Sequence, residues 1–375
     1  MLLLGASVRA VAASCGRAGI ACVGADLFAD TDAQQLAAIS QVVEYPKGLG
    51  EFAEQLPPSD WLFTGGLENY PQLISKISRR HRLLWNDEEA VSRVRNPVEL
   101  SRLVCSAGLP SPATTLTLPA DENSQQWLRK PRKSCGGTNV TFVNATATTE
   151  ATDVYYQAYI EGTPVGALFV GQAGAARLLG VTRQLVGPPW TSAVRYQYAG
   201  SVGPIHMESD VHQQLQHVGD LLAHDFRLRG LFGVDGILNE HGFWTVEVNP
   251  RYTASVEIWE RATGQSAIAA HIAACTDAGS QAAPAASANT LAESCHGKAI
   301  VYADTDARVE HDFARLVEQL NRSGESSIAD IPHFGTTILK GRPVCTVLAA
   351  GKSETQVMGC LKQRAQQVKA TLTDH

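Results

Sequence analysis

The sequence has few charged residues and no excess of positive charge. Only 18% of its 375 residues are Asp, Glu, Lys or Arg, and 37 acidic side chains against 31 basic ones give a formal net charge of −6. A nucleic-acid-binding protein is expected to carry a basic surface, and a protein that docks on anionic lipid a polybasic segment. The composition therefore favours small polar or anionic molecules as partners, with no nucleic acid and no membrane.

Long apolar runs and closely paired cysteines are also missing. No segment approaches the roughly 20 apolar residues of a membrane span, and the opening MLLLGAS has neither the basic region nor the apolar core of a signal peptide. The eight cysteines are scattered without a C-x₂-C pair, which disfavours both a zinc site and a disulfide scaffold. We therefore expect a cytoplasmic protein with reduced cysteines.

The most informative stretch runs from Leu231 to Arg251, LFGVDGILNEHGFWTVEVNPR, and predicts a β-hairpin. Two segments rich in apolar and β-branched residues flank the turn-forming sequence Asn-Glu-His-Gly. We expect a three-residue loop, Glu240–Gly242, that ends on a left-handed glycine. In this register Asp235 faces Glu247 across the two strands.

Alternation of side chains along a strand places these two carboxylates on the same face as the Asn249 amide. Two opposed carboxylates repel each other unless a divalent cation lies between them. Hard ions such as Mg²⁺ bind carboxylate and amide oxygens together with waters or substrate phosphates. The hairpin therefore predicts a Mg²⁺ site at Asp235, Glu247 and Asn249, with an ordinary solvated face as the alternative. The residues expected on the opposite, core face are Val234, Trp244, Val246 and Val248.

The sequence VDGIL, a short turn and WTVEVNPR together resemble the metal-binding segment of the ATP-grasp superfamily. Ligases of this superfamily join a carboxylate to an amine through an acyl phosphate. The resemblance implies ATP and Mg²⁺ as cofactors, with Asp235, Glu247 and Asn249 holding the metal on the ATP phosphates. It also implies that Arg251 is catalytic and stabilises charge on the transferring phosphoryl group.

A second segment, WLRKPRKSCGGT, places Lys130 at the end of a predicted strand, before a small loop with two glycines. Glycines let backbone amides approach phosphates, and a lysine ammonium neutralises phosphate charge. The segment resembles the lysine strand and flexible loop of ATP-grasp proteins. This implies Lys130 on the α- and β-phosphates, as a binding and catalytic group, and Ser134, Gly136 and Gly137 in the loop over them. A surface hairpin is the alternative.

A third segment, VYYQAYIEG, resembles the ATP-grasp hinge, whose backbone groups read the adenine edge. The resemblance implies adenine contacts from the Ala158 carbonyl and the Ile160 N–H, with Gln157 and Tyr159 beside them. Glu161 is the candidate substitute for the acid that binds ribose in related ligases. An ordinary strand remains the alternative, because backbone recognition leaves little trace in side chains.

Strands and helices alternate over the first hundred residues, beginning with LLLGAS, VRAVAASCGRAG and IACVGAD, and indicate a parallel sheet with helices on both faces. Ligands bind beyond the carboxyl ends of such strands, so Ser7 and Glu68 are candidate substrate contacts. Gly5 lacks the two further glycines of G-x-G-x-x-G, which argues against a nicotinamide dehydrogenase. Arg183, as a catalytic residue, and Arg195 are candidates for holding a substrate carboxylate.

The predicted fold is therefore an α/β ATP-grasp fold in several parts. We expect a parallel α/β substrate domain at 1–108, an ATP-grasp domain at 109–275 with its lid at about 120–162, an Ala/Ser/Pro-rich linker at 276–291, and a small β-rich C-terminal domain at 292–375. The C-terminal segment resembles that of biotin-carboxylase-like members.

The predicted activity is an ATP- and Mg²⁺-dependent ligation of a carboxylate to an amine, with release of ADP. The arrangement resembles predicted carboligases and ligases of the tyramine–glutamate type, so an amino acid such as glutamate is a candidate substrate, and a homodimer is a candidate assembly. Two alternatives stay open. One is a carboxylase that uses bicarbonate, and the other is a non-catalytic ATP-binding module, because the ribose-binding acid and a first lysine near Pro97–Val104 are not evident.

Overall fold

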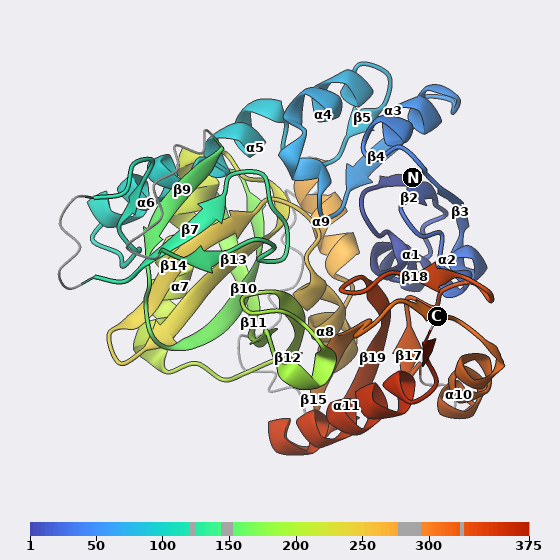
Figure 1. The fold of residues 1–375 in the computed structure, drawn as a ribbon. Coiled ribbons are helices and arrows are strands. Elements are labelled where there is room, and N and C mark those ends of the chain that lie inside the picture. Colours follow the sequence, from blue (N-terminus) through green and yellow to red (C-terminus); the bar gives the residue numbers. More distant parts are fainter. Residues whose placement is uncertain (120–124, 144–152, 277–293, 323–325, 375) are drawn as a thin grey trace.

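The computed structural model describes residues 1–119, 125–143, 153–276, 294–322 and 326–374. The chain forms an N-terminal α/β unit, a large antiparallel sheet and a C-terminal segment, and two helices of the middle of the chain lie between these parts (Figure 1). Two stretches of the predicted lid, 120–124 and 144–152, lie outside the described residues, as does the predicted linker apart from Thr276.

The N-terminal unit is a five-stranded parallel sheet, as predicted. Its strands lie in the order β3 (Ala38–Gln41), β2 (Val23–Asp26), β1 (Leu2–Leu4), β4 (Asp60–Phe63) and β5 (Arg82–Leu83). Its helices are α1 (Arg9–Arg17), α2 (Thr31–Leu36), α3 (Lys47–Glu54), the 3₁₀ turn η1 (Leu67–Asn69), α4 (Pro71–Ser78) and α5 (Glu88–Val94). The strand order reverses between β1 and β4, which is where ligands bind in open parallel sheets.

The loops that follow β1 and β4 lie in direct contact at this point. The Ala6 N–H donates to the Gly65 carbonyl at 2.9 Å, and the Thr64 hydroxyl donates to the Ser7 carbonyl at 2.8 Å. A Cβ atom added to Gly5 would lie 1.9 Å from the Thr64 hydroxyl oxygen, so only glycine permits this approach. The two loops therefore form one rigid edge facing the rest of the molecule.

Helix α6 (Pro97–Ser106) connects this unit to the middle of the chain. Asn96 caps its N-terminus, because the Asn96 side chain accepts hydrogen bonds from two N–H groups of the first turn, and Pro97 occupies the first helical position. The start of the helix is thus fixed by sequence, and Arg95 is fixed just before it.

The large sheet has eight strands and is antiparallel throughout. Its order is β14 (Gly242–Asn249), β13 (Gly230–Asn239), β10 (Thr163–Gln172), β11 (Ala175–Val186), β12 (Tyr198–Gly203), β15 (Cys295–Tyr302), β19 (Pro343–Gly351) and β17 (Ile328–Ala329). The last three strands belong to the C-terminal segment, so this segment continues the sheet. Its core, built on α11 (Glu354–Lys369), is separate from the core that α7 (Ser209–Asp225) forms on the other strands.

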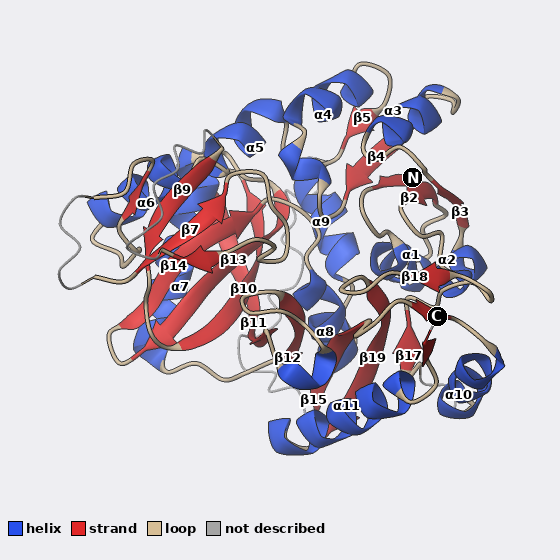
Figure 2. Cartoon of the chain, in the orientation of Figure 1, coloured by secondary structure: helices blue, strands red, loops and turns tan. Residues whose placement is uncertain are grey.

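The remaining elements complete the surroundings of the large sheet (Figure 2). A four-stranded sheet, β6 (Thr114–Thr115), β9 (Val154–Ala158), β7 (Trp127–Pro131) and β8 (Thr141–Phe142), carries the predicted lysine strand and hinge. Other elements are η2 (Pro189–Thr191), α8 (Ala254–Thr263), α9 (Ala267–Cys275), α10 (His311–Asn321), and the strands β18 (Thr337–Ile338), β16 (Ala307–Arg308) and β20 (Thr373–Asp374). Helices α8 and α9 lie between the large sheet and the N-terminal unit (Figure 1).

The β13–β14 hairpin forms, and Asp235 faces Glu247 as predicted, but the predicted loop is wrong. Asn239 pairs with Gly242, so the loop has two residues instead of three. A β-bulge between the pairs Gly236–Thr245 and Asp235–Glu247 leaves Val246 as an extra residue on β14 and restores the expected pairing.

The bulge also changes which side chains of β14 are buried. Phe243 and Val248 are in the core, whereas Trp244 and Val246, which we expected there, are only partly buried. Val246 lines a cavity instead. Because the extra residue shifts the alternation by one, the side chains before the bulge face opposite to the prediction and those after it face as predicted.

Among the described residues, no helix combines the length and the apolar character needed to cross a membrane.

Candidate active site

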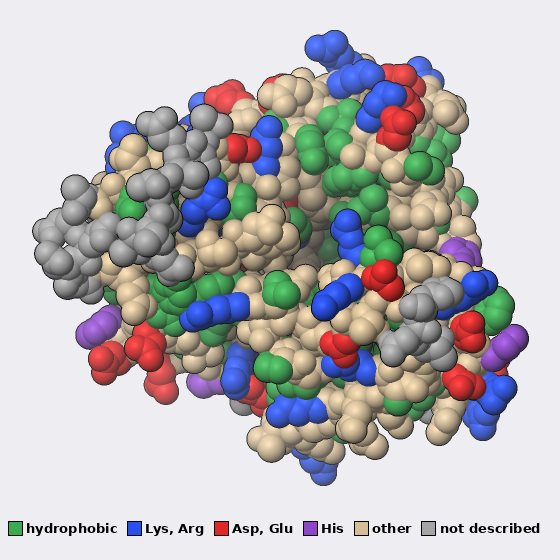
Figure 3. Space-filling view, viewed as in Figure 1, with side chains coloured by type: hydrophobic (Ala, Val, Ile, Leu, Met, Phe, Trp, Pro, Cys, Tyr) green, Lys and Arg blue, Asp and Glu red, His purple; other side chains and the backbone are tan. Residues whose placement is uncertain are grey.

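A cavity of about 960 Å³ lies where the three parts of the chain meet. The loops after β1 and β4, the lysine strand and its glycine loop, the hinge, the β13–β14 hairpin and the C-terminal strands all contribute to its walls. The space-filling view shows the molecule hollowed near the middle of one face (Figure 3). Segments that the sequence analysis identified separately therefore line the same cavity.

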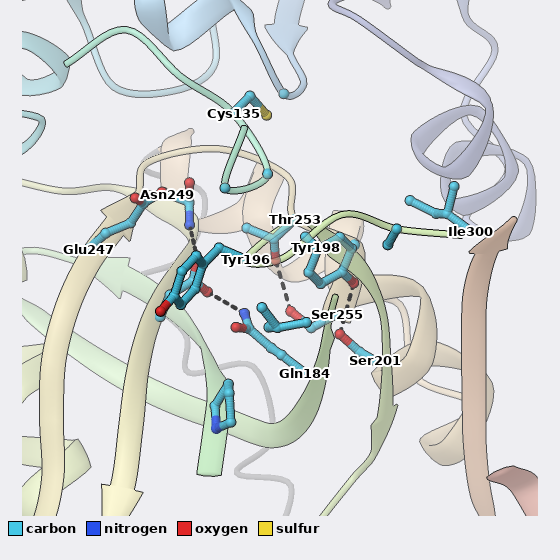
Figure 4. Close-up of a pocket in the computed structure, with 18 of the residues that line it drawn as sticks. Cys135, Gln184, Tyr196, Tyr198, Ser201, Glu247, Asn249, Thr253, Ser255 and Ile300 are labelled. Carbon is cyan, nitrogen blue, oxygen red and sulfur yellow. Dashed lines mark hydrogen bonds between the residues drawn. The ribbon is translucent and has the colours of Figure 1, made fainter. Parts of the chain in front are cut away.

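The end of the hairpin brings Asp235, Glu247 and Asn249 together in this cavity. The Asn249 amide donates to one oxygen of Asp235 at 2.7 Å, and the Gln184 amide donates to the other oxygen at 2.7 Å. Glu247 and Asn249 lie next to each other, across from the loop that carries Cys135 (Figure 4). Arg95 donates to the Glu247 carboxylate at 3.2 Å.

The two carboxylates titrate differently because their surroundings differ. Burial, with the charge of Glu247 beside it, raises the pKa of Asp235 to about 6. Burial alone also raises the pKa of Glu247, but the positive charges of Arg95, Lys130 and Arg251 outweigh it, and the pKa falls below its usual value. Asp235 is therefore the carboxylate that lacks a compensating cation.

The donor set at this position fits Mg²⁺. Two partly buried carboxylates and one buried amide oxygen supply hard oxygen ligands, and the unbalanced charge at Asp235 is what a bound cation would remove. Within the described part of the chain, no group of three or more His, Cys, Asp or Glu residues could hold a metal. A cation at the hairpin would thus need oxygens from a ligand such as a polyphosphate to complete its shell.

Arg251 lies beside this cluster and is held from several sides. Its Nε donates to Glu68 at 2.6 Å, and its terminal nitrogens donate to the Asn249 oxygen and the Tyr252 carbonyl, both at 3.2 Å. Burial alone would lower the pKa of the guanidinium, but the negative charge of Glu68 raises it above its ordinary value, so Arg251 stays charged. Glu68 is buried behind it and does not line the cavity, so its contact is with Arg251.

Lys130 extends from β7 into the cavity, and its position depends on Gln157 of β9. The Lys130 ammonium donates to the Gln157 side-chain oxygen at 3.0 Å and lies 5.5 Å from the centre of the Tyr155 ring. The Gln157 amide nitrogen donates in turn to the carbonyl of Val246, the extra residue of the bulge, at 3.3 Å. One buried glutamine thus joins the lysine strand to the hairpin.

The loop after Lys130 lies over the same cavity. Gly136 and Gly137 have left-handed backbone angles, with φ of 64° and 72°. The Tyr198 N–H donates to the Gly136 carbonyl at 2.9 Å, and a Cβ atom on Gly137 would lie 1.9 Å from the Tyr196 carbonyl oxygen. Ser134 lines the cavity beside them. Both glycines are required by conformation, because any other residue would be strained at these angles.

The predicted hinge also reaches the cavity, with Ala158, Tyr159 and Ile160 in its lining. The N–H groups of Ala158 and Tyr159 donate to the carbonyls of Ala113 and Gln126, both at 2.8 Å. No hydrogen bond recorded among the described residues uses the Ile160 N–H. This group can therefore donate to a ligand.

Two further predicted site residues, like Glu68, are not part of the cavity lining. Arg183 is half exposed, does not line the cavity and pairs with Glu354 of α11 at 2.5 Å. Its neighbour Gln184 faces the cavity, because adjacent side chains of a strand point to opposite faces. Glu161 is exposed, also outside the lining, and only its carbonyl is used, by Asn239. Arg183 and Glu161 therefore lie outside the cavity lining, and the roles predicted for them stay predictions.

Ser7 and Arg195 do line the cavity, at different walls. Ser7 belongs to the loop after β1, whereas the Arg195 guanidinium stacks over the rings of Phe142 and Tyr196 at 4.5 and 5.1 Å. The substrate contacts predicted for both residues stay predictions.

The sequence analysis missed Arg95, which is not part of the cavity lining but contacts two residues that are, Glu247 and Ser134. Besides Glu247, its guanidinium contacts the Asn69 side chain at 3.4 Å and the Ser134 carbonyl at 3.2 Å. The negative charges of Glu247 and Glu68 raise its pKa above the usual value, although burial lowers it. The available signal was its position directly before the Asn96–Pro97 helix start, where the chain passes from the N-terminal unit to the cavity.

Comparison with family models matches residues 95–255 to the ATP-grasp domain. The match includes the lysine strand, the glycine loop, the hinge and the metal-type hairpin in one continuous segment. Residues 95–255 therefore form an ATP-grasp domain. A comparison with curated protein sequences found no match.

Solved structures share this ATP-grasp fold over nearly the full chain. The biotin carboxylase domain of Hydrogenobacter thermophilus 2-oxoglutarate carboxylase, solved with MgADP, ADP and bicarbonate, has a TM-score of 0.73 at 12% identity, covering 99% of this chain and 90% of that one. L-amino acid ligase from Bacillus licheniformis has a TM-score of 0.69 at 13% identity, covering 98% and 97%. An ADP complex of N5-carboxyaminoimidazole ribonucleotide synthetase has a TM-score of 0.68 at 15% identity, covering 97% and 95%. At sequence identities this low, the similarity shows a shared fold and nothing more specific.

Proposed function

We propose that this protein is an ATP- and Mg²⁺-dependent ligase that joins a carboxylate to an amine through an acyl phosphate. The observation that carries the proposal is the shared cavity of the hairpin acids, Lys130 and Arg251. Buried acids alone would suit many proteins, but acids, a buried lysine and a fixed arginine around one space suit a polyphosphate whose terminal group is transferred.

Each group has a proposed task in this reaction. Lys130 contacts the α- and β-phosphates, the loop of Ser134, Gly136 and Gly137 covers them, and the backbone of Ala158 and Ile160 binds adenine. Bound Mg²⁺, held by Asp235, Glu247 and Asn249, would neutralise charge on the β- and γ-phosphate oxygens. Arg95, which contacts both Glu247 and the glycine loop, supplies a second fixed positive charge where no first lysine is evident.

The reaction takes place in two steps. A substrate carboxylate oxygen bonds to the γ-phosphorus, the bond from this phosphorus to the bridging oxygen breaks, and ADP leaves. The amine nitrogen then bonds to the carbonyl carbon, the bond from that carbon to the phosphate oxygen breaks, and phosphate leaves while the nitrogen loses a proton. Arg251, fixed by Glu68 and Asn249, stabilises negative charge on the transferring group.

Hydroxylamine provides a test, because it takes the place of the amine and converts an acyl phosphate into a stable hydroxamate. The full chain is incubated with ATP, Mg²⁺, hydroxylamine and a panel of carboxylates that includes glutamate. We expect one or more acids to give hydroxamate and ADP in equal amounts, with no product after EDTA treatment or in Asp235→Asn. Tight ATP binding without turnover across the panel would instead indicate a non-catalytic module.

A bicarbonate-dependent carboxylase is the second candidate, supported by the likeness to a biotin carboxylase domain that was solved with bicarbonate. The same experiment separates it from the first. Release of ADP that requires bicarbonate and no other carboxylate would favour the carboxylase and contradict the carboxylate–amine ligase.

A further inference from the structure

Two loops from opposite ends of the chain meet at one wall of the cavity. The Thr31 N–H and hydroxyl donate to the Ile331 carbonyl at 2.9 and 3.1 Å. The Asp32 carboxylate accepts hydrogen bonds from the N–H groups of Asp330 and Ile331 at 3.0 and 2.8 Å. These contacts fix the segment that begins α2 against the segment that follows β17, and both Asp30 and Asp330 line the cavity there.

Asp30 occupies an unusual position in this wall. It is the N-cap residue of α2, where an aspartate ordinarily accepts a hydrogen bond from the first turn, but its side chain makes no such bond. It is only 7% exposed. Among the residues that the structure describes, none donates a recorded hydrogen bond to the Asp30 carboxylate.

The nearby charged groups are already paired with one another. Arg9 donates to Glu257 at 2.6 and 3.0 Å and to Asp330 at 2.9 and 3.3 Å, so all three nitrogens of its guanidinium are engaged. Lys298 donates to Glu257 at 3.1 Å. Asp30 is thus the member of this acidic wall that has no cation of its own.

Burial of a carboxylate without a partner is unfavourable in the charged form. Burial, with the charges of Asp330, Asp32 and Asp26 nearby, raises the pKa of Asp30 to about 8. A bound cation that donates hydrogen bonds would reverse this effect. The neighbouring acids accept hydrogen bonds from the protein itself, Asp330 from Arg9 and both Asp32 and Asp26 from backbone N–H groups, whereas Asp30 accepts none within the described residues.

A metal ion fits this wall poorly. Both oxygens of Asp330 are bonded to Arg9, and both oxygens of Asp32 are bonded to backbone N–H groups. This leaves Asp30 as a single available carboxylate, whereas divalent cations in proteins take several oxygen ligands. A primary ammonium group needs fewer acceptors, and apolar atoms of Phe28, Ala6 and Ala10 in the adjoining lining suit an aliphatic chain behind it.

We propose that Asp30 binds an ammonium group of the substrate, so that one of the two ligated molecules is an aliphatic amine or an amino acid. This inference rests on the proposed ligase function for its place in the reaction. The ammonium group can belong to the acceptor amine or to the carboxylate-bearing substrate, and both share this chemistry.

The first experiment measures binding without nucleotide, so that it does not depend on catalysis. The full chain is titrated with n-butylamine, butan-1-ol and butyrate at pH 8.5 and constant ionic strength, as wild type, Asp30→Asn and the control Asp312→Asn. Asp312 makes the control comparable, since it loses the same charge from an exposed position on α10.

We expect the wild type and Asp312→Asn to bind butylamine about tenfold more tightly than butanol, and Asp30→Asn to lose that preference, as for a charge-assisted hydrogen bond. Equal binding of butylamine by wild type and Asp30→Asn would overturn the proposal. Protection from unfolding by Mg²⁺ alone that depends on Asp30 would also overturn it, in favour of a metal site.

The second experiment identifies the source of the ammonium group through the hydroxylamine assay with glutamate and glutarate. If it belongs to the acid substrate, Asp30→Asn raises the KM for glutamate and leaves that for glutarate unchanged. If it belongs to the acceptor, hydroxamate formation is unchanged and the KM for the amine rises in the full ligation. Either outcome supports the subsite. Absence of hydroxamate with every acid contradicts the ligase function, whereas the butylamine titration still decides the subsite.

Discussion

Arg251 and Glu68 form a buried ion pair in which only the arginine reaches the cavity. Glu68 contributes 1% of its side chain to the surface, and its second oxygen has no hydrogen-bond partner. A fully buried carboxylate of this kind is costly without its cation. Glu68 therefore positions Arg251, while Arg251 keeps Glu68 compatible with burial, so a change at either residue affects both activity and stability.

We predict that Arg251→Ala lowers kcat by about 100- to 1000-fold, the loss expected when one preorganised donor to a developing negative charge is removed. The affinity for ATP is expected to change far less, because Lys130 and the glycine loop remain. Hydroxamate formation under saturating ATP gives kcat, and a nucleotide titration gives the dissociation constant.

The same variant is expected to lose about 3–5 kcal/mol of unfolding free energy, because Glu68 is left buried and unpaired. The double variant Arg251→Ala/Glu68→Gln provides the control. It should recover most of the stability in urea unfolding but none of the activity. Recovery of activity together with stability would show that Arg251 acts only through the fold.

At this scale, residues singled out in two separate motifs lie around the same space. Asp235, Glu247 and Asn249 of the hairpin and Lys130 of the lysine strand all line the cavity. Arg183 does not, because its neighbour Gln184 takes the inward face, and nothing in a lone sequence fixes the phase of alternation in β11. Arg95 could not be found from local pattern either, since its partner Glu247 is 152 positions away.

The hairpin shows how elements can agree with a prediction for a different reason. A three-residue loop and a two-residue loop followed by one bulge both place Asp235 opposite Glu247. The extra residue in the loop and the extra residue in the bulge each shift the pairing of the two strands by one position. The pattern of apolar residues specified the hairpin itself. It could not specify where the extra residue lies, because the carbonyl left unpaired by the bulge is satisfied by Gln157 of a distant strand.

We predict that Gln157→Met weakens ATP binding and destabilises the protein. Methionine fills a similar volume but cannot accept from Lys130 or donate to the Val246 carbonyl, so two buried polar groups lose a partner, at about 1–3 kcal/mol each. Urea unfolding and an ATP titration measure the two effects.

Gln157→Glu is the matched comparison for this element. A glutamate keeps an acceptor for Lys130 and loses the donor to Val246. We expect ATP affinity to stay closer to wild type in Gln157→Glu than in Gln157→Met. Equal loss of ATP affinity in both would mean that the bond to the bulge, rather than the bond to Lys130, controls the nucleotide site.

At the scale of the whole molecule, His271 connects the large sheet to the end of β5 in the N-terminal sheet. The Leu231 N–H of β13 donates to His271 Nδ1 at 2.9 Å, and Nε2 donates to the Leu84 carbonyl, beyond β5, at 2.7 Å. This arrangement requires the neutral imidazole. The centre of the Trp85 ring lies 3.9 Å from that of the imidazole, and the Cys275 sulfur lies 4.0 Å from Nδ1. Burial lowers the pKa of His271 to about 4.

We predict that His271 makes stability depend on pH between about 4 and 6.5. Its pKa is lower in the folded than in the unfolded chain, so its contribution is complete above pH 6.5 and is lost as the pH falls toward 4, by about 3 kcal/mol in total. His271→Gln, which can donate and accept at the same positions, should remove this part of the dependence. Urea unfolding across this pH range is the measurement, with the exposed His224→Gln as control; parallel curves for wild type and His271→Gln would contradict the prediction.

The sequence predicted the kinds of sheet in the molecule, but it did not predict that the strands of the C-terminal segment continue the large sheet. Alternating strands and helices predicted the parallel sheet, and the three ATP-grasp motifs predicted the central fold. The joining of β15 to β12 was not predictable, because these strands lie about a hundred residues apart and neither carries a pairing signal of its own. A strand that is apolar on both faces has the same sequence pattern whether it extends a neighbouring sheet or begins a new one.

The contact between the first helix and the segment after β17 has a consequence for how the chain is made. Arg9 and Asp32 emerge from the ribosome about three hundred residues before Asp330 and Ile331, which complete their hydrogen bonds. Domains usually fold as units from the N-terminus during synthesis. Here the N-terminal unit cannot complete these contacts until Asp330 and Ile331 have been synthesised, so nascent chains stalled before Asp330 are expected to remain sensitive to protease near α1 and α2.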